Sequence, residues 1–181
     1  IHKKNPLSDL MAKESLRLIG NSIQTATHNG SDKKAREEML LGAMLAGQAF
    51  ANSPVAAVHA LAYPLGGHFH IPHGLSNSLV LPHVLRFNLN NAATLYAELA
   101  PIIFPNENFS GSDIEVATTL VENIEALIKE LGLPTTLKEM DIEKSFLPQL
   151  AQDAMLQTRL LVNNPTEIKL EDALAIYQMA Y

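Results

Sequence analysis

Apolar residues recur at spacings of three and four along most of the chain, as they do on the buried face of an amphipathic helix. No stretch alternates apolar and polar residues in the manner of a half-buried strand. The chain is therefore expected to be all-α. The pattern predicts helices over about residues 6–27, 32–47, 55–63, 73–85, 92–103, 112–131, 146–156 and 171–181.

Capping residues and prolines mark the expected ends of these helices. Asn5-Pro6 predicts a start, because asparagine can accept from the free amides of the first turn and proline fits that turn. Ser53-Pro54 is interpreted in the same way, as the start of the third helix. The segment 64–67, Pro-Leu-Gly-Gly, is expected to end that helix, and Pro82 to interrupt or kink the next one.

The composition limits the function classes. A length of 181 residues suits one domain, and 47% hydrophobic against 18% charged residues can build a core. With 13 basic and 19 acidic residues there is no basic face for nucleic acid. The absence of cysteine excludes disulfides and thiolate ligands. No membrane-spanning or export segment is recognised, so we expect no membrane association and a cytoplasmic location.

Four of the seven histidines lie between positions 59 and 73. Neutral imidazole is a common metal ligand near neutral pH, and divalent metals need several converging ligands. His59 lies in an alanine-rich helix, where a buried ring needs a partner; a metal is one partner, and a backbone carbonyl is the ordinary alternative. His73 stands at a helix start. We expect Gly66 and Gly67 to let the chain double back, so that His59 and His73 face each other.

The other histidines receive weaker assignments. His68 and His70 alternate in what we expect to be an extended loop, so they should point to opposite sides. We expect His68 to face solvent and His70 to line a pocket. His2, His28 and His83 lie apart from the cluster and receive no role. Protease HExxH, GxSxG, P-loop and GxGxxG signatures are absent.

Six segments form an ordered series along the chain: Gly42–Asn52, His59–Gly67, Ile71–Asn77, Leu81-Pro82, Phe87-Asn88 and Asn164-Pro165. This series resembles the iron-containing (group III) alcohol dehydrogenase family. The resemblance continues from residues 5–9 to 171–176, so we treat 1–181 as a single helical domain. It implies the all-α array of the C-terminal domain of that family, which is dehydroquinate synthase-like.

The resemblance also implies a metal site. Family members bind iron(II), or zinc in some relatives, through one Asp and three His, and the last two of these match His59 and His73. The first two, an Asp and a His four residues later, would precede Asn5, and no such pair occurs in this chain. The family's N-terminal α/β domain, which binds NAD or NADP, is likewise expected to be absent from this chain. We therefore expect half of a metal site and an inactive fragment.

Three further residues are expected around the substrate and cofactor. Many relatives carry another histidine four residues after the third ligand, and here that position is Tyr63. We assign Tyr63 a catalytic or cofactor-binding role, and Phe50 and His70 a place in the cofactor pocket.

The implied reaction is hydride transfer between a nicotinamide and a small alcohol, aldehyde or ketone, with the metal activating the substrate oxygen. A homodimer or larger homo-oligomer is expected. The alternatives are a sister activity on the same fold, such as a maleylacetate reductase or a zinc polyol dehydrogenase, or a non-enzymatic helical interaction module.

Overall fold

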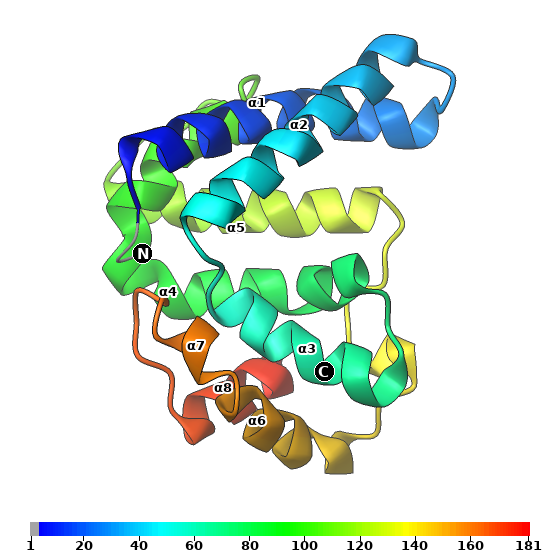
Figure 1. The fold of residues 1–181 in the computed structure, drawn as a ribbon, viewed down its shortest axis with the longest axis vertical. Coiled ribbons are helices and arrows are strands. Elements are labelled where there is room, and N and C mark those ends of the chain that lie inside the picture. Colours follow the sequence, from blue (N-terminus) through cyan, green and yellow to red (C-terminus); the bar gives the residue numbers. More distant parts are fainter. Residues whose placement is uncertain (1–3) are drawn as a thin grey trace. The chain divides into compact units, whose positions relative to one another are not determined.

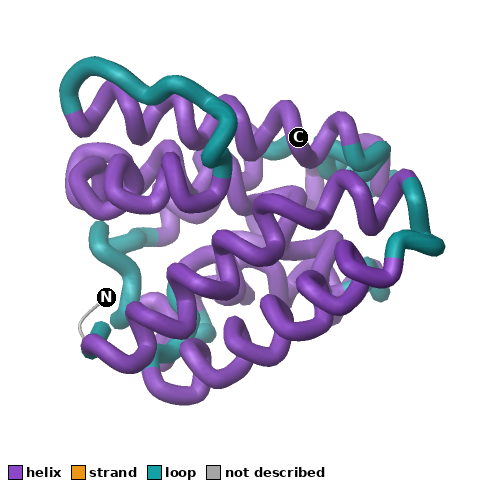
Figure 2. Tube along the Cα trace, turned by 90° about the horizontal axis from the view of Figure 1, so that it is seen from above, coloured by secondary structure: helices purple, strands orange, loops and turns teal. Residues whose placement is uncertain are grey.

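The computed structural model describes residues 4–181, and in this range every regular element is a helix (Figure 1, Figure 2). The all-α prediction is therefore confirmed. The elements are α1 (Pro6–His28), α2 (Lys33–Asn52), α3 (Ala57–Phe69), α4 (His73–Ile103), α5 (Asp113–Glu130), η1 (Lys138–Met140), η2 (Lys144–Phe146), α6 (Leu147–Met155), α7 (Thr158–Leu161) and α8 (Leu170–Met179).

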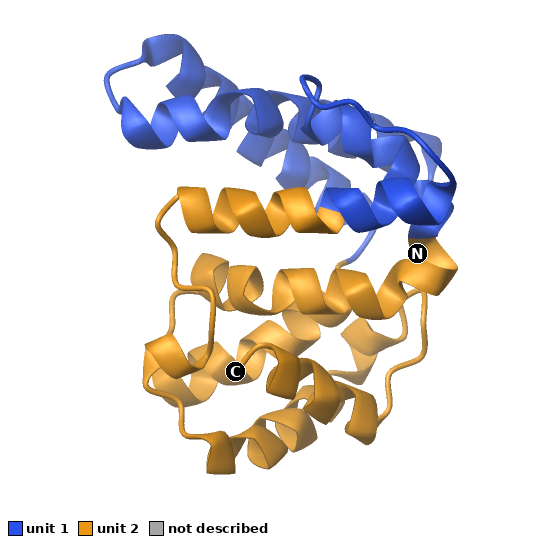
Figure 3. Cartoon of the chain, turned by 180° about the vertical axis from the view of Figure 1, so that it is seen from behind, with its two compact units in different colours: residues 1–54, 93–120 blue, residues 55–92, 121–181 orange. Residues whose placement is uncertain are grey.

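The chain separates into two compact units, coloured in Figure 3. Unit 1 comprises the chain up to residue 54 together with residues 93–120. Unit 2 comprises residues 55–92 and 121–181. Helices α4 and α5 therefore each contribute one part to each unit.

Within unit 1, α1 and α2 form a closely packed hairpin. The Asn5 side chain accepts from the amides of the first turn of α1, as the sequence predicts. The buried Ser15 hydroxyl donates to the Gly42 carbonyl at 2.7 Å, which joins the two helices. A Cβ atom at Gly42 would lie only 2.7 Å from the Ile19 side chain. The absence of a side chain at Gly42 thus permits this close approach.

The core of unit 2 forms around α3, α6 and α8 and takes in buried residues of α4. Helix α3 is its centre, because Leu61 and Leu65 are fully buried. Tyr177 of α8 is also fully buried, and its hydroxyl donates to the Leu61 carbonyl at 2.6 Å. The segment that carries His59 is thus held between packed helices.

The predicted bounds of α3 were wrong at both ends. Ser53 ends α2, and α3 begins at Ala57 without a side-chain cap. The helix then continues through Pro64 to Phe69. Proline removes the hydrogen bond to the carbonyl four residues earlier, but Pro64 is buried and the Tyr177 hydroxyl donates to a carbonyl in the same turn. Packing and this hydrogen bond keep the helix intact.

Helix α4 is likewise one element where two were predicted. It runs through Pro82 and joins the segments predicted at 73–85 and 92–103. A proline inside a helix costs about 3 kcal/mol, whereas burying one large aliphatic side chain gains about 1.5–3 kcal/mol. Leu79, Val80 and Val84 are all buried around Pro82. Their burial offsets the cost of the proline.

A buried amide pair ties α4 to the segment before α8. The Asn88 side-chain amide donates to Asn164 Oδ1 at 3.0 Å, and the Asn164 amide donates back to Asn88 Oδ1 at 2.8 Å. Both residues are buried. Two segments quoted above, Phe87-Asn88 and Asn164-Pro165, thus meet in space and satisfy each other's polar groups.

Candidate metal centre

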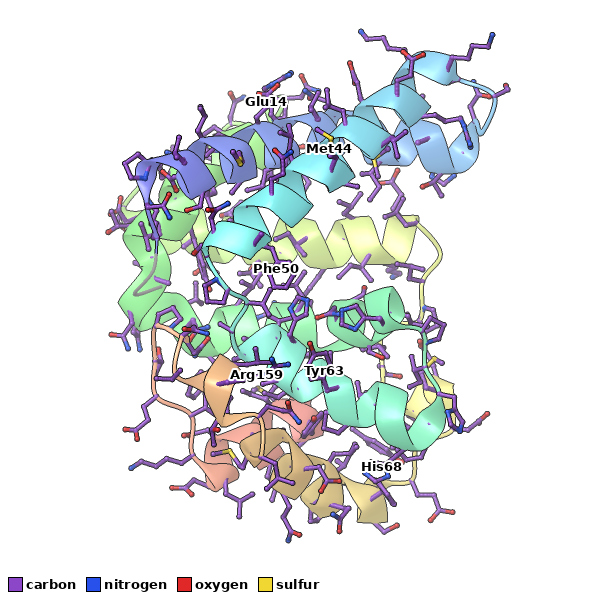
Figure 4. All side chains as sticks on the ribbon, viewed as in Figure 1. Glu14, Met44, Phe50, Tyr63, His68 and Arg159 are labelled. Carbon is purple, nitrogen blue, oxygen red and sulfur yellow. The ribbon has the colours of Figure 1, made fainter. Side chains whose placement is uncertain are left out.

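The structure brings the rings of His59 and His73 together within unit 2. Their centroids lie 5.2 Å apart at an interplanar angle of 54°. His59 is in the first turns of α3, and His73 is the first residue of α4. Tyr63, labelled in Figure 4, lies one turn after His59. It completes a three-ring group, with its ring centroid 6.4 Å from that of His59 and 5.9 Å from that of His73.

The reversal that places the two rings together is not the one expected. Gly66 and Gly67 lie inside α3, and the helix ends at His70, which has left-handed backbone angles (φ 55°). The His70 amide donates to the Gly66 carbonyl at 3.1 Å, which closes the last turn. The chain therefore reverses over residues 70–72 and enters α4 directly at His73.

Burial keeps the His59 imidazole neutral. It lowers the pKa of His59 below its usual value, and the nearby His73 lowers this pKa further. A neutral imidazole retains a lone pair that a metal can use. Within residues 4–181, no hydrogen bond occupies the ring nitrogens of His59.

The sequence-based assignment overlooked Asn77, although it lies four residues after His73 on the same helix and therefore on the same face. Its side-chain nitrogen donates to the His73 carbonyl at 2.7 Å and lies 3.2 Å from His73 Nε2. Its Oδ1 is buried and has no hydrogen-bond partner in the described part of the chain.

The donors present fit half of a divalent-metal site. Two neighbouring imidazoles suit iron(II) or zinc, which are commonly held by histidine nitrogen and carboxylate oxygen. Across residues 4–181, however, no group of three or more His, Asp or Glu side chains is placed to hold a metal ion. Among the described residues, His59 and His73 are therefore not joined by a third side chain of these types.

The prediction of an extended loop around His68 and His70 is wrong, although His68 is exposed as expected. His68 belongs to α3 and not to an extended loop, and its Nε2 lies 2.6 Å from the Asp153 carboxylate. Its ring also packs on Phe146, with centroids 5.1 Å apart (Figure 4). His70 is exposed and takes part in none of the ring contacts found in residues 4–181. His68 lies in the helix and His70 ends it, so the two side chains do not alternate along an extended loop as expected.

Phe50 belongs to α2 in unit 1 and is 54% exposed. An open hollow of about 620 Å³ also lies in unit 1, but none of the predicted site residues lines it. The places of Phe50 and His70 in a pocket remain predictions. No helix in the described part of the chain is long and apolar enough to cross a membrane.

The family model described as "Fe-containing alcohol dehydrogenase family, C-terminal" matches residues 2–181. The chain belongs to this family. The family resemblance seen in the sequence is thereby confirmed along nearly the whole chain.

Curated relatives in the family include two bacterial enzymes. The chain is 42% identical over 177 residues to long-chain-alcohol dehydrogenase 1 of Geobacillus thermodenitrificans, covering 98% of this chain and 45% of that protein. It is 33% identical over 178 residues to 1,3-propanediol dehydrogenase of Klebsiella pneumoniae, again covering 98% and 45%. The chain thus spans slightly less than half the length of these relatives.

Solved structures of the family share the fold. A 1,3-propanediol oxidoreductase matches with a TM-score of 0.93 at 33% identity, over 99% of this chain and 46% of that one. The alcohol dehydrogenase of Oenococcus oeni matches with a TM-score of 0.93 at 32% identity and the same coverage. The fold prediction, the helical array of the C-terminal domain of iron-type alcohol dehydrogenases, is therefore confirmed.

Proposed function

We propose that this chain supplies the helical, metal-binding part of an NAD(P)-dependent alcohol dehydrogenase, which interconverts a small alcohol and its aldehyde or ketone. The observation that carries the proposal is the pair of imidazoles of His59 and His73, 5.2 Å apart in a chain that belongs to the iron-containing family. The coverage of 45% of the relatives supports a protein whose remaining half binds the nicotinamide.

His59 and His73 would hold iron(II), or zinc, together with an aspartate and a histidine from outside the described residues. A metal held there would supply polarisation of the substrate oxygen, and a nicotinamide cofactor would supply the hydride chemistry. We further propose that the enzyme acts in the cytoplasm as a homodimer or larger homo-oligomer.

In this proposal the residues of this chain bind the metal and orient the substrate. Burial keeps His59 neutral and therefore able to offer a lone pair. The ring of Tyr63 stands nearly perpendicular to that of His59, at 89°, so its phenol extends from the edge of the pair. We assign Tyr63 to the wall of the substrate pocket, where its hydroxyl can exchange a proton with a bound alcohol. Phe50 and His70 are the other proposed wall residues.

The test compares His59→Ala and His73→Ala in the full-length gene product. Each change removes one of about four metal ligands, so we expect metal content and alcohol oxidation to be lost together. His28→Ala is the matched control, because His28 is exposed at the end of α1, far along the chain from the pair. Element analysis by mass spectrometry measures the metal content.

Two outcomes would contradict the proposal. If His59→Ala and His73→Ala both retain their metal, these residues are not its ligands. If the full-length wild-type protein binds neither metal nor a nicotinamide cofactor, the non-enzymatic helical interaction module becomes the better interpretation.

A further inference from the structure

The Asn77 side chain makes two contacts with His73, one with its backbone carbonyl and one with its ring. Only the backbone contact is of a kind that other asparagines in this protein also make. An asparagine in a helix often donates to the carbonyl four residues earlier. Asn52 does so to Gln48 at 2.8 Å, and Asn77 does so to His73 at 2.7 Å. The nitrogen of Asn77 additionally lies 3.2 Å from the ring Nε2 of His73.

The backbone contact fixes the orientation of the Asn77 amide. If the amide were turned over, its oxygen would lie against the His73 carbonyl oxygen, and neither of these atoms can donate. The NH₂ group therefore faces His73, with one hydrogen on the carbonyl and the second available to Nε2. The Oδ1 atom points away and remains buried without a partner in residues 4–181.

An NH₂ group can only donate, so the ring nitrogen that it meets must accept. The neutral His73 imidazole then carries its proton on Nδ1 and has its lone pair on Nε2. A lone pair on a ring nitrogen is what a metal ion requires.

We propose that Asn77 is a positioning residue for His73, whose amide fixes the Nδ1–H tautomer and occupies the Nε2 lone pair until a metal ion takes its place. The inference rests on the proposed function, since it concerns the metal ligand His73. The hydrogen bond to the His73 carbonyl does not involve the ring, so it holds the amide beside the ligand in either state. Asn77 thereby keeps the ring in the orientation and tautomer that metal binding needs.

The first measurement addresses the tautomer without any metal. The full-length protein is labelled with ¹⁵N in its histidine rings and stripped of metal with a chelator. Spectra are recorded near pH 9, where imidazoles are neutral because their usual pKa is about 6.5. The His73 signals are assigned by their loss in His73→Ala.

We expect wild-type His73 to carry its proton on Nδ1. Asn77→Leu keeps the approximate shape but removes the donor, so His73 should shift toward the Nε2–H form that free imidazole favours. Asn77→Asp replaces the donor with an acceptor, so it should also favour Nε2–H. Asn91→Leu is the matched control, because Asn91 lies on the same helix and donates to Thr166 instead. Circular dichroism verifies that each variant retains its helices.

The second measurement is the affinity for Zn²⁺ alone, by competition with a chelating dye. Loss of the hydrogen-bond partner of the second ring nitrogen of a metal-ligating histidine typically weakens binding about 10- to 100-fold. Asn77 meets the ligating nitrogen itself and must yield it to the metal, so we expect Asn77→Leu to weaken Zn²⁺ binding by at most about tenfold, through loss of the preset tautomer and ring orientation. Asn91→Leu should bind as the wild type does.

The outcomes separate the two proposals. Metal retained in His73→Ala refutes the proposed function and with it the role of Asn77. Metal lost in His73→Ala, combined with an unchanged tautomer or an unchanged Zn²⁺ affinity in Asn77→Leu, refutes the role of Asn77 alone. A wild-type His73 in the Nε2–H form does the same.

Discussion

The hydroxyl of Tyr177 should make a measurable contribution to the stability of unit 2. The side chain is fully buried, and its hydroxyl donates to the Leu61 carbonyl in the turn of α3 that Pro64 weakens. Tyr177→Phe keeps the ring and removes one donor, so it leaves a buried carbonyl with one partner fewer. Such a loss costs about 0.5–1.5 kcal/mol of unfolding free energy.

The pH dependence of the unfolding free energy gives a second, independent measure of the contribution of Tyr177. Burial raises the pKa of Tyr177 far above its usual range, and the charge of Asp153 raises it further. The unfolded phenol ionises above about pH 10, whereas the buried phenol stays protonated. The folded state then binds more protons than the unfolded state, so stability falls as pH rises, by about 1.4 kcal/mol per pH unit. Below about pH 10 the full contribution of the hydroxyl is present.

Urea unfolding followed by circular dichroism measures both effects. We expect Tyr177→Phe to be less stable than wild type near neutral pH. The difference in unfolding free energy between the two proteins should narrow by about 1 kcal/mol between pH 10 and 11, because the unfolded phenol is only half ionised at pH 10. Tyr181→Phe is the matched control, because no hydrogen bond of its hydroxyl is found in residues 4–181. A gap below about 0.5 kcal/mol, or one that stays constant with pH, would refute the reasoning.

Two further pairs of variants test packing in each unit. Asn88→Leu should lower the unfolding free energy by about 1–3 kcal/mol because it leaves Asn164 Oδ1 buried without its donor, although the Asn164 amide still donates to the Thr166 carbonyl. Changing both residues to leucine should recover part of that loss in thermal unfolding. A double variant no more stable than the single one would contradict this. In unit 1, Gly20→Ala should cost about 1–3 kcal/mol, because its Cβ would lie 2.3 Å from the Ile103 carbonyl oxygen. Gly47→Ala has open space and should gain about 0.5–1 kcal/mol, so urea midpoints that move alike would disprove the packing argument.

The helices were predictable where local signals and burial agree. The spacing of apolar residues and the Asn5 cap placed α1 within one residue of its observed end. The errors in α3 and α4 fall at prolines, whereas α2 continues five residues past its predicted end and α7 and η1 were not predicted. The cost of a proline in a helix can be judged from the sequence, but the burial that offsets it at Pro64 and Pro82 comes from residues distant in the chain. The spacing of apolar residues alone does not reveal how deeply a helix will be buried.

The candidate site was predictable to a similar degree. The proximity of His59 and His73 was inferred correctly, although the turn was placed at the wrong residues. The prediction overlooked Asn77 because an asparagine within a helix has no distinctive sequence signal. Its significance comes from one distance to one ring atom. The metal role of the histidine pair and the pocket role of Tyr63 stay predictions.

The short path between the two imidazoles has a consequence for how a metal would affect folding. His59 and His73 are joined only by the rest of α3 and residues 70–72, so a metal that bridges them closes a small loop. The entropy that a cross-link removes from the unfolded chain grows with the length of the loop it closes. For a loop of about 15 residues the entropy removed corresponds to about 3 kcal/mol, so the bridge alone would add appreciable stability to unit 2. A ligand remote in sequence would close a longer loop and add further stability, but only by about 0.6 kcal/mol for each doubling of the loop length.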